Sequence, residues 1–295
     1  MFADDSKLSY SYNPKSFDPQ PLLDTLQKIY EWCQKWGLSL AASKTVVLHL
    51  GKYNPNFQYT LNGMPLVAQK EVRDLGITIS NNLSMDSHVK KIVRSAKQKI
   101  YLLFKILKTN DPEILIKAYN SYVRPIVEAS STLFSPKNVT LIDSIENVQR
   151  KVTRKIFLRC KSKLLQNRLN IPKYLERCKI LKLQTLEYRR LEADALFGIR
   201  LLQNPTIDST PYVTMVTVRT RTKVCYRTPG RWKLSNHFYS TIPRLTRNLS
   251  SIVKNFPDIL NLKTSDAIKF RVSEVDDLSL SSNSANFRYQ PINIL

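Results

Sequence analysis

The chain is poor in glycine, cysteine and histidine, and this scarcity excludes several classes of protein. Its 295 residues include 6 Gly, 4 Cys and 3 His. The glycine share is below the usual value of about 7%, and the Leu, Ile and Lys content favours helix over an all-β fold. Because Cys33, Cys160, Cys178 and Cys225 form no C-x-x-C pair, we predict neither a zinc site nor a disulfide framework. We expect buried thiols in a reducing compartment.

Long apolar segments are also missing. No run approaches the length of about 18 apolar residues that a membrane span needs. The N-terminus is acidic and lacks the basic and then apolar pattern of a secretory signal, so secretion is not indicated. A hydrophobic content of 42% over this length predicts about two domains with a real core.

Acidic residues are scarce in the middle of the chain, and the formal charge of +23 is therefore unevenly placed. The net charge is +1 over residues 1–84, +24 over 85–272 and −2 over 273–295. A basic block of this size attracts polyanions, most simply nucleic acid, although a membrane surface would also attract it.

The N-terminal acid pair is the first candidate for chemistry. Asp4 and Asp5 follow Phe2-Ala3 and precede the alternating run Lys7–Tyr12, which predicts a tight turn leading into a strand. Adjacent carboxylates at a strand end can hold Mg²⁺ bridged to phosphate oxygens, as nucleotidyl transfer requires. On its own, an N-terminal Asp-Asp is more often a solvated turn or a helix start.

The elements after the acid pair are predicted to be mixed. Asp18-Pro19 should open a helix that Gly37 closes. A buried strand is expected over Thr45–Leu50, and another short strand over Val72–Ile79. Asn62-Gly63 should form a type I′ hairpin between Phe57–Leu61 and Met64–Val67.

The order of these motifs resembles the reverse transcriptases of non-LTR (LINE-like) retrotransposons. The aromatic-Ala-Asp-Asp segment is followed by Trp32 and Trp36, then by Gly37–Thr45 and finally by Leu75-Gly76. In that family an Asp-Asp loop precedes a W-x-x-x-W helix, a G-L-x-L-N-x-x-K-T segment and an L-G hairpin. One departure is Ala41, where the family pattern has Asn.

The resemblance implies roles for several residues. Asp4 and Asp5 would hold Mg²⁺, Lys44 would lie near the incoming triphosphate, and the Leu75-Gly76 hairpin would steady the primer end. Lys44 is otherwise compatible with an exposed lysine at a strand end. The family takes a further Asp from a strand upstream of the acid pair. We therefore expect that the chain begins inside the palm and does not polymerise alone.

Long basic helices are predicted after residue 84. No acidic residue occurs between Ser87 and Asn110, where Val89, Val93, Ala96 and further apolar residues form one helical face. The opposite face carries Lys90, Arg94, Lys97, Lys105 and Lys108. A second helix is expected from Asp111-Pro112 through Leu133, with a kink at Pro125.

A third helix should run from about Leu141, with Leu141, Ile145, Val148, Val152 and Ile156 facing inward. Its outward cations are Arg150, Lys151, Arg154, Lys155 and Arg159. The three helices could form a bundle, and the resemblance implies a thumb that holds the template-primer duplex through its phosphates. A charged stripe can also be no more than a solvated helix face.

We therefore predict an α+β fold in four parts. They are a partial reverse transcriptase palm of antiparallel strands plus a helix, with a primer-grip-like hairpin (1–84), a thumb-like basic helical region (85–170), a helical connector with a small C-terminal unit (171–272) and a disordered tail (273–295). The connector is expected to be helical from Ile171 to Gln203.

Two functions of different classes follow. The chain is a fragment of an RNA-directed DNA polymerase, which incorporates dNTPs only with the upstream palm supplied, or a non-catalytic basic protein derived from such an element that binds RNA, DNA or their hybrid. A membrane-surface protein is a third and weaker alternative, because Trp and Phe do not line the apolar faces of the basic helices. The family implies an intracellular, nuclear location.

Overall fold

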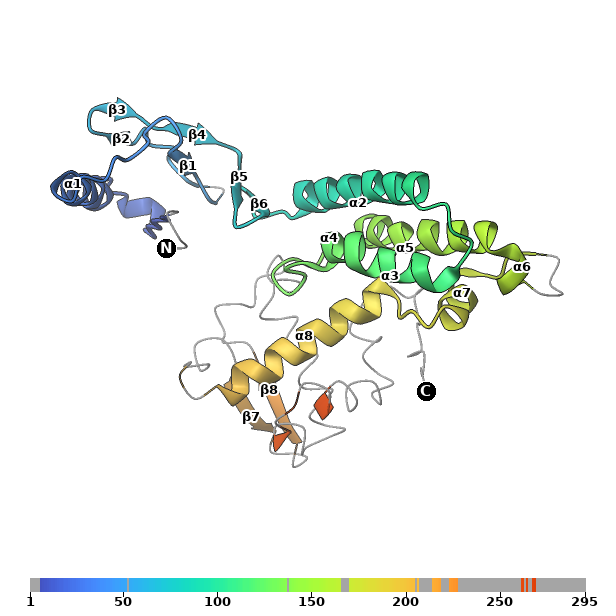
Figure 1. The fold of residues 1–295 in the computed structure, drawn as a ribbon. Coiled ribbons are helices and arrows are strands. Elements are labelled where there is room, and N and C mark those ends of the chain that lie inside the picture. Colours follow the sequence, from blue (N-terminus) through green and yellow to red (C-terminus); the bar gives the residue numbers. More distant parts are fainter. Residues whose placement is uncertain are drawn as a thin grey trace. The chain divides into compact units, whose positions relative to one another are not determined.

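The structure, a computed structural model, describes residues 6–51, 53–136, 138–165, 170–204, 206, 214–218 and 223–227, together with 261, 262, 264, 267 and 268. The chain divides into two compact units, Met1–His88 and Val89–Leu295. Each is described here by itself (Figure 1). Helices and small sheets occur together, so the predicted α+β class is confirmed.

The first unit is organised around helix α1 (Gln20–Lys35). The helix begins directly after Asp18-Pro19, as predicted, and the Asp18 carboxylate accepts a hydrogen bond from the Gln20 amide at 2.9 Å. It ends before Gly37, whose φ of +66° continues the chain in the left-handed region. Its apolar side packs on a small core of Tyr59, Leu61 and Leu66.

Three two-stranded sheets complete the part of this unit that the structure describes. Strands β1 (Val46–Leu48) and β4 (Val67–Gln69) pair in parallel, whereas β2 (Thr60–Leu61) with β3 (Met64–Pro65) and β5 (Glu71–Asp74) with β6 (Ile77–Ser80) pair antiparallel. The type I′ turn is confirmed, since Asn62 and Gly63 have φ values of 49° and 73°.

Several predictions for this unit were wrong. Lys7–Tyr12 alternates in sequence but forms no strand; instead, the rings of Tyr10 and Tyr12 lie 5.6 Å apart. Val72–Ile79 is a hairpin and not a single strand, because the chain reverses at Leu75-Gly76. The β1–β4 pair is parallel, and the expectation of antiparallel strands was therefore wrong for this pair. Alternation alone does not choose a hydrogen-bonding partner.

The described part of the second unit is mainly helical. Its elements are α2 (Asp86–Ile106, which starts at the end of the first unit), α3 (Pro112–Tyr122), α4 (Arg124–Glu128), α5 (Val139–Arg159), α6 (Lys161–Leu164), α7 (Tyr174–Ile180), α8 (Leu186–Gln203) and the antiparallel pair β7 (Thr214–Val218) and β8 (Lys223–Arg227). The predicted tail, residues 273–295, lies outside the described residues.

Two predicted helices are interrupted. The helix expected to reach Leu133 stops at Tyr122, resumes as α4 and ends at Glu128. Pro125 lies in the first turn of α4, where its missing N–H costs nothing. The connector helix expected from Ile171 to Gln203 is split into α7 and α8 by a loop in which Lys182 has a φ of 51°.

Helix α5 is the centre of the second unit. Its predicted inward row is confirmed as buried: Leu141, Ile145, Val148, Val152 and Ile156. Helices α3, α7 and α8 all pack on α5. The segment expected to be a connector is thus part of the same compact unit as the basic helices.

Candidate nucleic-acid interface

Helix α2 has one buried face and one cationic face, as predicted. Val89 and Ala96 are fully buried, and Val93 and Ile100 nearly so. The predicted cations are all exposed: Lys90, Arg94, Lys97, Lys105 and Lys108. We call these five residues the α2 stripe.

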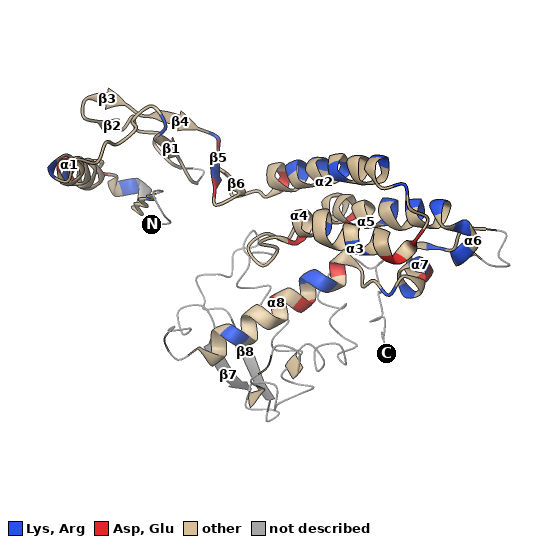
Figure 2. Cartoon of the chain, in the orientation of Figure 1, with Lys and Arg blue, Asp and Glu red and all other residues tan. Residues whose placement is uncertain are grey.

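The α2 stripe has no carboxylate partner among the residues that the structure describes. Along α2, bands of Lys and Arg repeat, whereas Asp occurs only where the helix starts (Figure 2). The helix ends at Ile106, so Lys108 follows it in coil and not on the helix. Exposed, unneutralised cations at helical spacing suit contacts to phosphates.

Beside the α2 stripe lies a groove of about 910 Å³. Its lining from α2 is Lys90, Val93, Arg94, Lys97, Gln98, Tyr101 and Leu102, and its lining from α5 is Leu141 and Ser144. Tyr101 is 61% exposed, and the Lys105 ammonium lies 5.9 Å from the centre of its ring. The sequence interpretation named the cations but missed Tyr101, which occupies the helical position between Lys97 and Lys105.

The cations predicted on α5 fall into two groups. Lys151, Arg154 and Lys155 are exposed, as expected. Arg150 is half-buried, donates to Asp143 at 3.1 Å and lies 5.3 Å from the centre of the Tyr174 ring. Arg150 therefore contributes packing and an ion pair inside the unit and is less available to a ligand.

Arg159 likewise has an internal role. Its guanidinium donates to the carbonyl oxygens of Phe104 and Leu107, which lie at the C-terminal end of α2. It also lies 5.0 Å from the centre of the Phe104 ring. A cation here satisfies carbonyls that α2 leaves unpaired and joins the end of α2 to the end of α5.

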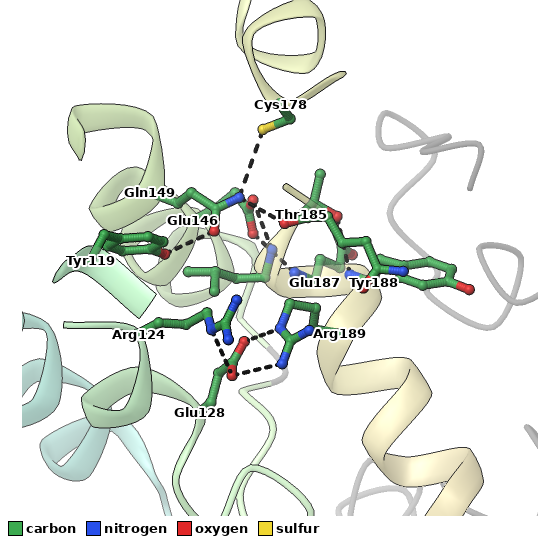
Figure 3. A network of polar contacts seen from close by, with 12 residues as sticks. Tyr119, Arg124, Glu128, Glu146, Gln149, Cys178, Thr185, Glu187, Tyr188 and Arg189 are labelled. Carbon is green, nitrogen blue, oxygen red and sulfur yellow. Dashed lines mark hydrogen bonds and ion pairs between the residues drawn. The ribbon is translucent and has the colours of Figure 1, made fainter. Parts of the chain in front are cut away.

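A buried carboxylate anchors α8 to α5 (Figure 3). Glu146 is 1% exposed and accepts from the backbone amides of Leu186 and Glu187 at 3.2 and 3.0 Å. It also accepts from the Tyr174 hydroxyl. Thr185 caps the same helix by accepting from the Tyr188 amide. A negative charge at a helix N-terminus interacts favourably with the helix dipole.

Gln149 extends this network (Figure 3). It accepts from the Tyr119 hydroxyl at 2.8 Å and donates to the Gln184 carbonyl at 2.8 Å and to the Tyr174 hydroxyl at 3.0 Å. Burial raises the pKa of Tyr119 well above its usual value, and raises that of Cys178 to about 11. Both groups are protonated at neutral pH, and their contacts with Gln149 join α3, α5 and α7.

An ion pair also connects α8 to the rest of the unit. Arg189 binds both carboxylate oxygens of Glu128, whose Oε2 also lies 3.5 Å from Nε of Arg124. Burial raises the pKa of Glu187 to about 7, with Glu146 adding to the shift and Arg190 opposing it. We call the contacts of buried Glu146 and Gln149, together with the half-buried Glu128–Arg189 pair, the α8 network. Sequence reasoning gave no role to any of the four.

The predicted catalytic residues belong to the first unit. Asp4 and Asp5 lie outside the described residues, so their role with Mg²⁺ stays a prediction. Within the described part of the chain, no three His, Cys, Asp or Glu side chains are grouped as metal ligands. Lys44 is exposed and ends a turn in which its amide donates to the Ala41 carbonyl at 3.0 Å.

Leu75 and Gly76 have φ values of 46° and 86°, and they form the predicted hairpin turn. The Lys7 ammonium lies 2.5 Å from the Asp74 carboxylate, next to that turn. The Lys7 side chain thus lies beside the Leu75-Gly76 hairpin.

The comparisons with known proteins identify no family. No family model matches the chain, and no solved structure matches it. One relative is an uncharacterized protein of Caenorhabditis elegans, which is 25% identical over 95 residues. The match covers 32% of this chain and 48% of that protein, so the chain spans about half the length of the curated relative it matches. Within the described residues, no helix is long and apolar enough to cross a membrane.

Proposed function

We propose that the chain binds nucleic acid through the exposed face of α2, without sequence preference, and that it derives from the reverse transcriptase of a non-LTR retrotransposon. The observation that carries the binding proposal is the α2 stripe, five exposed cations with no carboxylate partner among the described residues. Solubility alone does not require cations of one sign along a whole helix face.

The derivation rests on the resemblance, with one supporting contact. The Lys7–Asp74 ion pair lies next to the Leu75-Gly76 turn, and Lys7 follows Asp4 and Asp5 closely in the sequence. The resemblance implies that these two pieces of a palm cooperate at the primer end. RNA-directed DNA synthesis with Mg²⁺ is the activity of that family, and Asp4, Asp5 and Lys44 are the residues to which we assign its chemistry.

As an alternative to RNA-directed DNA synthesis, the chain is a basic protein of the same origin that binds RNA, DNA or their hybrid and catalyses no synthesis. It is supported by the fact that the α2 stripe and the buried core beneath it belong to one helical unit. Phosphate contacts from such a unit position a nucleic acid and need no active site.

A pair of matched variants tests the binding. The first changes Lys90, Arg94 and Lys97 to Glu. The control changes Lys15, Lys28 and Lys35 to Glu, three exposed lysines of the first unit that alter net charge by the same amount. With a labelled duplex, fluorescence anisotropy should show at least about a tenfold loss of affinity in the first variant and a much smaller loss in the control. Equal losses would mean that only net charge matters and that the α2 stripe is not the interface.

A further inference from the structure

We infer that the groove beside the α2 stripe holds an unpaired nucleotide, whose base stacks on Tyr101 while its phosphates contact the neighbouring cations. This inference rests on the proposed nucleic-acid binding and assigns the kind of strand that this face prefers. A row of cations alone would accept single and double strands alike, because both present phosphates.

The first argument is the position of Tyr101 in the row. Lys97, Tyr101 and Lys105 follow one another at intervals of four residues, so all three lie on one side of the helix. An aromatic ring therefore interrupts a line of cations, with an ammonium 5.9 Å from its centre. Single-strand binding proteins combine these parts, an aromatic platform for bases and a cationic groove for the backbone.

The second argument is the shape and lining of the groove. Its volume of about 910 Å³ falls in the range of about 300–1,000 Å³ that ligand pockets occupy. Val93, Leu102 and Leu141 give it apolar walls, and the hydroxyl of Ser144 is already bonded to the Leu141 carbonyl. Apolar walls beside an exposed ring suit the flat face of a base, while Lys90, Arg94 and Lys97 suit phosphates.

The third argument is charge, which favours a nucleic acid over a second copy of the chain as the occupant of the groove. Among the residues that the structure describes, no carboxylate lines the groove, and the chain carries a net charge of +23. A second copy of the chain would bring the same positive charge to this face and be repelled. In a duplex, the faces of the bases are covered by their neighbours, so only an unpaired base can use the Tyr101 ring.

The test compares a labelled oligothymidylate with a duplex of the same length, using the full chain and fluorescence anisotropy. Tyr101→Ala should weaken binding of the oligothymidylate about tenfold, as expected for the loss of one stacked base, and change duplex binding less than about twofold. Tyr101→Phe keeps the ring and should bind like the wild type. Tyr122→Ala, which removes a tyrosine on α3 that is 69% exposed and does not line the groove, should also bind like the wild type.

A second readout does not depend on affinity. Ultraviolet irradiation of a bound strand that contains bromouracil should produce a cross-link at Tyr101, which mass spectrometry of the digested complex would locate. A cross-link found only elsewhere in the chain would overturn the inference even if the affinities changed as expected.

The remaining outcomes separate the inference from the proposed function. If the wild type binds both strands and Tyr101→Ala binds both as well as the wild type does, the groove holds no base, but the binding proposal stands. If the wild type binds neither strand, the proposed function fails and the inference fails with it. If a polyglutamate peptide binds and depends on Tyr101 while the oligothymidylate does not, the occupant is an acidic protein segment and the inference is wrong.

Discussion

Two sets of cations in the second unit differ in what surrounds them. The α2 stripe, mostly lysines, is exposed and has no carboxylate partner among the described residues. The arginines at 150, 159 and 189 are half-buried and bind carboxylates or carbonyl oxygens of the same unit. A guanidinium can satisfy several fixed acceptors at once, whereas an ammonium on a flexible stem remains hydrated. The net charge of the unit therefore overstates the number of cations that a polyanion can contact.

The comparison predicts that the two sets control different properties. Changes in the α8 network should lower the free energy of unfolding and leave the affinity of the folded protein for nucleic acid intact. Changes in the α2 stripe should lower the affinity for nucleic acid and leave the free energy of unfolding nearly unaltered.

The largest effect is expected for Glu146→Ala. The substitution removes the acceptor of the Leu186 and Glu187 amides and of the Tyr174 hydroxyl, and leaves these buried groups unpaired. The free energy of unfolding should fall by about 3 kcal/mol, measured by urea unfolding followed by circular dichroism. Lys151→Ala, at an exposed position on the same helix, should change it by less than about 0.5 kcal/mol. Similar values for both variants would show that the α8 network is not a main source of stability.

A smaller effect is expected for the Glu128–Arg189 pair. A double-mutant cycle with Glu128→Ala and Arg189→Ala should give a coupling energy of about 1.5 kcal/mol, because the contact is bidentate and half-buried. The matched cycle on Lys7 and Asp74, whose lysine side chain is 68% exposed, should give less than about 0.5 kcal/mol. A coupling energy as large for the exposed pair would contradict the distinction between internal and surface cations.

The third effect depends on pH and on Glu187. Its pKa is raised to about 7 in the folded state from the ordinary value of 4.5, so the folded state binds the proton more tightly. The contribution of this group to stability is fully present below pH 4.5 and is lost as the pH rises through 7. Glu187→Gln should therefore be more stable than the wild type by about 1 kcal/mol at pH 8, and this gain should vanish near pH 4.5. A constant difference at all pH values would show that Glu187 titrates normally.

The smallest effect is expected for neutralising the α2 stripe. Changing Lys90, Arg94 and Lys97 to Gln should leave the free energy of unfolding within about 0.5 kcal/mol of the wild type, since these side chains are exposed. Helix content should also persist, because Val89, Val93 and Ala96 still pack on the other face. Loss of helix in this variant would mean that the cations stabilise α2 themselves.

Features set by local chemistry could be predicted from the sequence. The two faces of α2, the inward row of α5 and the turn at Asn62-Gly63 all follow from periodicity or from residues that tolerate positive φ. Strand pairing could not be predicted, because Lys7–Tyr12 alternates without finding a partner and β1 pairs in parallel with β4. Pairing depends on contacts between distant segments.

The candidate site could be predicted only in part, because the sequence shows spacing along one helix but not contacts between helices. The cations of the α2 stripe follow from the spacing of Lys and Arg along one helix. The roles of Glu146 and Arg159 depend on where α8 and the end of α2 lie, and no spacing within α5 carries that information. Tyr101 could have been found, since it stands at the helical position between Lys97 and Lys105.

The salt dependence of duplex binding tests the central claim most directly. The logarithm of affinity falls with the logarithm of salt concentration at a slope of about −0.9 for each phosphate contact. Changing Lys90, Arg94 and Lys97 to Gln should make this slope shallower by up to about 2.7, and changing Lys15, Lys28 and Lys35 to Gln should leave it unaltered. The account predicts a clear difference between the two variants. The same slope in both, with helix content intact, would contradict the assignment of the α2 stripe as the surface that binds nucleic acid.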